Sequence, residues 1–103
     1  MPYNYNTCIK RMENFEEFVH YKHNMSGGIN PYLKEKYINL IKQYAYHYSI
    51  YSYNTLICFV NYKDKTYSIN PVKYSRTTSK QVWCIIKAAR TWERNGYRRI
   101  LWI

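Results

Sequence analysis

The sequence predicts one small α+β domain, residues 1–103, with helices packed on one face of a small antiparallel sheet. Three observations favour this fold class. The length suits one compact domain, apolar residues recur at helical spacing in two long segments, and two short strand-like runs flank a polar turn. The expected order of elements is helix, helix, strand, strand, helix, strand.

Two helices are expected in the N-terminal half. Residues 13–20 predict a short first helix, because Asn14 can cap it and Glu17 completes a capping pair three residues later. Residues 26–28 (Ser-Gly-Gly) are expected to end this segment. An Asn-Pro pair then favours a new helix start, and apolar residues at helical spacing extend the second helix over about residues 31–48.

A β-hairpin is expected next. Residues 55–60 form a continuous apolar run, which is typical of a central strand covered on both faces. Residues 61–65 are polar and predict a turn, and residues 66–69 return as a second strand.

The third helix has marked ends. Thr78 and Gln81 match a capping box, and Asn95-Gly96 suits the left-handed residue that ends a helix. Its expected core face consists of Val82, Ile85, Ile86, Ala89 and Trp92. Residues 97–103 have high β propensity, so we expect them to join the sheet of the hairpin or to pair across a homodimer axis.

The opposite side of the third helix is basic. On a helical wheel, four cations and one indole share an arc of about 80°. These residues are Lys80, Trp83, Lys87, Arg90 and Arg94. Lys73 and Arg76 precede the helix and Arg98 follows it. Alternation places Arg98 and Arg99 on opposite faces of the last strand, so at most one of them easily joins the basic side of the helix.

The charge of the chain is strongly positive and unevenly placed. Sixteen Lys and Arg oppose six Asp and Glu, for a net charge of +10. Residues 71–103 alone carry eight basic residues and one acidic residue, for a net charge of +7. Such a field attracts polyanions. Nucleic acid, an acidic protein and an anionic membrane surface are all candidate partners of such a field. Of these partners, we expect nucleic acid or a host nucleoprotein complex.

A basic helix that carries an aromatic side chain suits nucleic acid for three reasons. Lys and Arg neutralise phosphates, and a Trp side chain can stack on an unpaired base. The helix start, with the hydroxyls of Thr77, Thr78 and Ser79, can receive a phosphate oxygen on its free N–H groups. In the alternative interpretation, the cations only solvate the helix and Trp83 packs under a neighbouring loop.

Cytoplasmic localisation in a host cell is expected, without membrane binding. No apolar run reaches the roughly 18 residues that a membrane span needs, and residues 1–10 lack the apolar centre of a signal peptide. The three cysteines (Cys8, Cys58 and Cys84) are odd in number and widely spaced, which argues against a disulfide framework. Cys58 and Cys84 lie in apolar runs and are expected to be buried.

Neither a metal site nor a cofactor is expected. The three histidines, His20, His23 and His47, are scattered, and no Cys-x-x-Cys pair occurs. No Gly-rich phosphate-binding loop and no spacing typical of a catalytic site is found. We therefore expect a protein without enzymatic activity.

Two segments carry a resemblance to a known group of proteins. Residues 52–57 (Ser-Tyr-Asn-Thr-Leu-Ile) and 73–80 (Lys-Tyr-Ser-Arg-Thr-Thr-Ser-Lys) resemble segments of small phage and mobile-element proteins of unknown function. In that group a "SYNT-aliphatic" segment opens a hairpin and a "YS-x-TTSK" segment opens a helix. A His often follows the second segment there, but Gln81 stands at this position here. The resemblance covers roughly residues 50–90 and implies a phage context.

Small phage proteins that lack an active site typically act by occupying a surface. The expected function is a non-enzymatic binding protein that acts on nucleic acid or a nucleic-acid-loaded host complex. Its most specific form is an anti-defence inhibitor of anti-CRISPR type. The alternative is a phage accessory or regulatory protein that binds DNA or RNA directly, and a small enzyme is the third and least favoured option.

Overall fold

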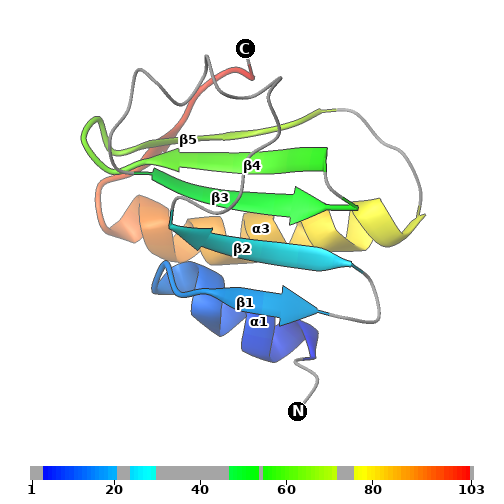
Figure 1. Ribbon diagram of the computed structural model, residues 1–103. Helices are drawn as coiled ribbons and strands as arrows, with labels where there is room; N and C mark the ends of the chain where they lie inside the picture. The colour runs from blue at the N-terminus through cyan, green and yellow to red at the C-terminus, as the bar shows by residue number, and fades with distance from the viewer. Residues whose placement is uncertain (1–3, 21–23, 30–46, 54, 72–75, 103) are drawn as a thin grey trace.

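A mixed six-stranded sheet with helices on one face forms the domain (Figure 1). The computed structural model describes residues 4–20, 24–29, 47–53, 55–71 and 76–102. Its elements are α1 (Tyr5–Glu13), β1 (Phe18–His20), β2 (Met25–Ile29), β3 (His47–Ser52), β4 (Thr55–Asn61), β5 (Thr66–Ile69), α3 (Arg76–Arg94) and β6 (Arg98–Arg99). The strands lie in chain order, all neighbours being antiparallel except β5 and β6, which are parallel. The α+β class is therefore confirmed, although the sheet is mixed rather than antiparallel.

Helix α1 begins and ends through local hydrogen bonds. The Asn4 side chain accepts a bond from the Thr7 N–H at 2.8 Å, which caps the first turn. At the other end Phe15 has φ 55°, and the N–H groups of Phe15 and Glu16 donate to the carbonyls of Met12 and Arg11. A left-handed conformation costs a non-glycine residue about 1–2 kcal/mol, so the packing of the Phe15 ring must offset that cost.

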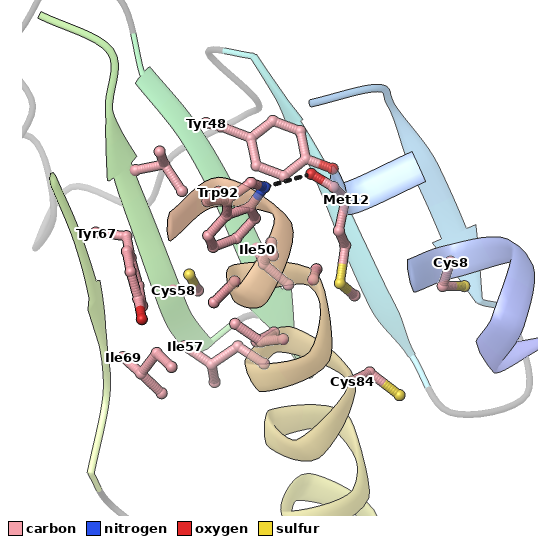
Figure 2. Packing of buried hydrophobic residues seen from close by; sticks show 14 of the residues in the cluster. Cys8, Met12, Tyr48, Ile50, Ile57, Cys58, Tyr67, Ile69, Cys84 and Trp92 are labelled. Atoms are coloured by element: carbon pink, nitrogen blue, oxygen red, sulfur yellow. Dashed lines mark hydrogen bonds between the residues drawn. The ribbon is translucent and has the colours of Figure 1, made fainter. Parts of the chain in front are cut away.

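The Phe15 ring lies at the centre of an aromatic cluster. Its centroid is 5.0–5.5 Å from the ring centroids of Tyr48, Tyr62, Trp92 and Tyr97. Trp92 of α3 is fully buried, and its Nε1 donates a hydrogen bond to the Met12 carbonyl of α1 at 3.0 Å (Figure 2). The cluster therefore joins both helices to the sheet.

The core lies between the helices and the sheet. On the helix-facing side, β3, β4 and β5 contribute Tyr48, Ile50, Cys58, Val60, Tyr67 and Ile69 (Figure 2). His47, Ser49 and Phe59 lie on the second side of the sheet and are also buried. Strand β4 is thus central and covered on both faces, as the apolar run predicted.

The predicted first helix, residues 13–20, is wrong. The helix ends at Glu13, and residues 18–20 form β1, with the Phe18 and His20 side chains buried and Val19 exposed. This alternation has the period of a strand. The helix is capped by Asn4 and begins at Tyr5, eight residues earlier than expected.

The Ser-Gly-Gly segment, residues 26–28, lies within β2 and does not end an element. Gly27 pairs with Phe18 of β1, and a Cβ atom at Gly27 would collide with the Phe18 ring. The glycine is needed here for close approach, not for a turn. Of the predicted second helix, residues 31–46 lie outside the described residues, while residues 47 and 48 belong to β3.

The hairpin is confirmed, as strands β4 and β5. The Asn61 side chain accepts bonds from the N–H groups of Lys63 and Asp64, which holds the turn between them. In β6 only Arg98 and Arg99 are strand, although the Ile100 N–H still donates to the Tyr67 carbonyl at 2.8 Å. The last segment therefore joins the sheet of the hairpin, as expected, but through a short parallel pairing.

Helix α3 is confirmed, with one correction at its start. Gly96 has φ 92°, and the Tyr97 N–H donates to the Trp92 carbonyl, so the predicted left-handed stop is present. The helix begins at Arg76, so Thr78 lies inside it, and Gln81 is a buried residue rather than a partner in a capping box. Among the described residues, neither helix combines the length and the apolar character that a membrane crossing requires.

Candidate nucleic-acid interface

The side of α3 that faces away from the core gathers cations around one indole. We call this set of five residues the basic face: Lys80, Trp83, Lys87, Arg90 and Arg94. All five side chains are exposed, whereas the residues between them along the helix are largely buried against the sheet or α1. The helical period thus brings together residues that are up to fourteen positions apart in the sequence.

The buried side of α3 differs in part from the prediction. Ile85, Ala89 and Trp92 are buried as expected, but Ile86 is 39% exposed and lies beside the basic face. Two residues that the apolar pattern did not single out, Gln81 and Ala88, are buried, as is Cys84, whose burial was expected. Helix α1 packs along the second half of α3, and Gln81 in the first half is hydrogen-bonded to Ser52 of β3.

Trp83 lies on the surface of the molecule. Its side chain is 53% exposed, and the Lys87 Nζ lies 3.9 Å from the centroid of its ring. This cation–π contact between residues four apart is worth about 0.5–1 kcal/mol at an exposed site. It holds the ammonium over one face of the indole, and the half-exposed ring remains accessible to a ligand.

The carboxylates nearest to the basic face are engaged by hydroxyl groups. Glu93 accepts a hydrogen bond from the Tyr67 hydroxyl at 2.9 Å. Burial, and then this hydrogen bond, raise the pKa of Tyr67 to about 12, so the phenol stays protonated at neutral pH. Glu13 of α1 accepts a bond from the Thr91 hydroxyl at 2.6 Å.

Both carboxylates therefore accept bonds from hydroxyl groups and form no ion pair with the basic face. The ion pair found between described residues, Arg11 with Glu16 at 3.8 Å, lies elsewhere. Within the part of the chain that the structure describes, no carboxylate comes within 4.0 Å of a cation of the basic face.

The predicted residues that flank the helix have mixed outcomes. Arg98 is paired with Thr66, which places it on the side of the sheet away from α3. Arg99 is paired with Tyr67, so Arg99 and not Arg98 lies on the α3 side of the sheet.

At the start of α3, Ser79 is exposed. Arg76, Thr77 and Thr78 stand in the first turn of α3, and their side chains are outside the described part. Lys73 also lies outside the described residues.

Lys65, in the turn between β4 and β5, is a cation that the sequence analysis missed. Its Nζ lies 3.5 Å from the Asn95 carbonyl and 6.0 Å from the centroid of the Tyr97 ring. A cation at a helix C-terminus is stabilised by the carbonyl groups that are left free there. The contact joins residues 30 positions apart, so no local pattern in the sequence could have revealed it.

The first segment that carried the sequence resemblance contacts the residue that directly follows the second segment. Ser52, in the first segment, donates a hydrogen bond from its Oγ to the Oε1 of Gln81, which directly follows the second segment. Both side chains are buried, and the bond ties the end of β3 to the first half of α3. These two positions therefore have a structural role in this protein.

Among the described residues, the histidines and cysteines are not gathered into a metal site. His20 stacks on Tyr5 on the helix side of the sheet, whereas His47 stacks on Phe59 on the other side. His23 is outside the described residues, and no group of three potential ligands is found among the residues that are described.

The three cysteines are buried and free, as expected for Cys58 and Cys84. Burial raises the pKa of the Cys8 and Cys84 thiols to about 11, which keeps both thiols protonated and weakly nucleophilic at neutral pH.

The fold and the candidate site together define a small α+β domain with an exposed basic helix. A family model described as a family of unknown function (DUF8033) matches residues 4–99. The chain belongs to this family. Comparisons with curated proteins and with solved structures gave no match.

Proposed function

We propose that this protein is a non-enzymatic binding protein that engages nucleic acid, either free or within a host nucleoprotein complex, through the basic face of α3. One observation carries the proposal. Four exposed cations and an exposed indole share one side of a helix, and no described carboxylate pairs with them.

The physical basis is the release of counterions. Each phosphate that a Lys or Arg neutralises frees condensed ions from the nucleic acid, which makes binding favourable at low salt. The net charge of +10 adds long-range attraction for any polyanion. The Lys65 side chain at the C-terminal end of α3, and Arg99 beside β5, extend the positive surface beyond the helix itself.

The more specific form of the proposal is an anti-defence inhibitor of anti-CRISPR type in a phage context. Such an inhibitor would dock the basic face on the guide nucleic acid or on an acidic surface of the effector complex. Support for the phage context comes from the resemblance of residues 52–57 and 73–80, while the basic face supports the nucleic-acid target. A directly binding DNA or RNA accessory protein is the alternative.

Charge reversal tests the use of the basic face. The variant Lys87→Glu/Arg90→Glu reverses two exposed charges at its centre, and the matched control Lys63→Glu/Arg98→Glu makes the same change in net charge away from it. Fluorescence anisotropy with labelled DNA and RNA oligonucleotides at 50 mM salt measures binding, and thermal melting checks the fold. We expect loss of binding in the first variant alone. Equal binding by both variants would refute the proposal.

A pull-down from host lysate distinguishes the two forms of the proposal. Bait that captures nucleic acid directly loses its partners after nuclease treatment, whereas an inhibitor retains one host complex at moderate salt. In both cases the Lys87→Glu/Arg90→Glu bait should fail to capture the partners that the Lys63→Glu/Arg98→Glu bait captures. Recovery of the same partners by both baits would exclude the basic face.

A further inference from the structure

We infer that the ligand of the basic face is single-stranded nucleic acid, one base of which stacks on the indole of Trp83. This inference rests on the function proposed above and names its substrate class. It is carried by two observations: the accessibility of the indole among the cations, and the helix that flanks α3.

The Trp83 indole is placed to receive a base. Its ring is 53% exposed, and Lys87 is held over one face at 3.9 Å. A base can stack on the face that Lys87 leaves open, while Lys80 and Lys87, one turn to either side along the helix, reach phosphates on both sides of that base. In a duplex the bases are already stacked on each other, so the indole gains no such contact.

Helix α1 limits how far the flanked part of α3 can enter a duplex groove. The Thr91 hydroxyl bonds Glu13 at 2.6 Å, and the Trp92 indole bonds the Met12 carbonyl at 3.0 Å, so the two helices lie side by side on the sheet (Figure 1). Packed helix axes are about 8–10 Å apart, which makes the pair about 20 Å wide with side chains. The major groove of B-DNA is about 12 Å wide and admits one helix.

Three of the four cations of the basic face lie along the part of α3 that α1 flanks. Lys87, Arg90 and Arg94 stand on the same turns as Thr91 and Trp92, which contact α1. These cations can therefore meet phosphates on an open strand that passes over the helix. From Lys80 to Arg94 the helix rises about 21 Å, which matches about six stacked nucleotides at about 3.4 Å each.

The test compares a labelled 12-nucleotide oligo-dT strand with a 12-base-pair duplex by fluorescence anisotropy at fixed salt. Trp83→Leu removes the stacking ring and keeps an apolar side chain, and Trp83→Phe keeps a ring. Leu101→Ala, which removes the 89% exposed Leu101 side chain elsewhere on the surface, is the control. We expect Trp83→Leu to weaken single-strand binding about 5- to 150-fold, the range measured for removing one base–aromatic stack. Trp83→Phe should retain most of that binding, and Leu101→Ala all of it.

The outcomes separate this inference from the proposed function. Single-strand binding that Trp83→Leu leaves unchanged, while Lys87→Glu/Arg90→Glu abolishes it, would overturn the stacking inference and leave the proposed function standing. Tighter binding of the duplex than of the single strand by the wild-type protein would overturn the inference in the same way. Failure to bind either probe at low salt would overturn the inference together with the directly binding form of the proposed function, while the pull-down tests the form that acts on a host complex.

Discussion

Removal of two charges from the centre of the basic face should change the salt dependence of binding by a calculable amount. The variant is Lys87→Gln/Arg90→Gln, in which exposed cations of α3 become neutral residues that also favour a helix. Its fold should be retained, because the lost cation–π contact with Trp83 is worth about 0.5–1 kcal/mol and exposed substitutions rarely cost more.

The magnitude follows from the four cations of the basic face. If each of them neutralises one phosphate of a single strand, log K falls with log salt at a slope of about −2.8. The variant leaves two contacts, so its slope should be about −1.4. At 0.1 M salt each contact contributes a factor of about five to the affinity, so the variant should bind about 25-fold more weakly.

The assay is anisotropy titration of a labelled single strand between 50 and 300 mM salt. Lys63→Gln/Arg98→Gln is the matched control, because it removes two charges in the turn after β4 and on the far side of β6. We expect the control to keep the wild-type slope. A wild-type slope near zero, or equal slopes in both double variants, would refute the assignment of phosphate contacts to the basic face.

Three further predictions concern the stability of the fold. Gly27→Ala should lower the free energy of unfolding by about 1–3 kcal/mol in a urea titration, because its methyl group overpacks β1 against β2; an unchanged midpoint would contradict the strand pairing. Gln81→Leu should lower the free energy of unfolding by about 1–3 kcal/mol, because it leaves the buried Ser52 hydroxyl without this acceptor. Adding Ser52→Ala to Gln81→Leu should recover part of that loss, whereas additive losses of the two single variants would argue against the bond. Burial raises the pKa of Cys8 and Cys84 to about 11, so the unfolded chain ionises first and stability should fall as the pH rises from about 9 to 11; a flat urea midpoint over that range would contradict the buried thiols.

The C-terminal half of the fold was predictable because its signals are local. The apolar run of residues 55–60, the polar turn after it and the Asn95-Gly96 stop each act within a few residues, and the structure contains a strand, a turn and a helix end at those places. The basic face was predictable for the same reason, since a helical period alone decides which side chains share one side of α3.

The N-terminal half misled the sequence analysis where tertiary packing outweighs local preference. Asn14 and Glu17 match a helix start, yet Asn14 ends α1 and residues 18–20 form β1. A glycine is needed at position 27 because the Phe18 ring of the neighbouring strand lies against it. Such a close approach depends on which strand pairs with β2, and the sequence of a single segment does not specify its pairing partner.

Within the candidate site, the sequence by itself determined the amphipathic character of α3 and the cations that share its outer side. Only the tertiary structure decided that Arg99 rather than Arg98 faces α3, that Lys65 reaches the end of the helix, and that Gln81 is bonded to Ser52 in the core. The physical reason is the range of the interactions. Helical periods and caps act over three or four residues, whereas strand order, register and the packing of α1 on α3 are set by contacts between residues that are far apart in the chain.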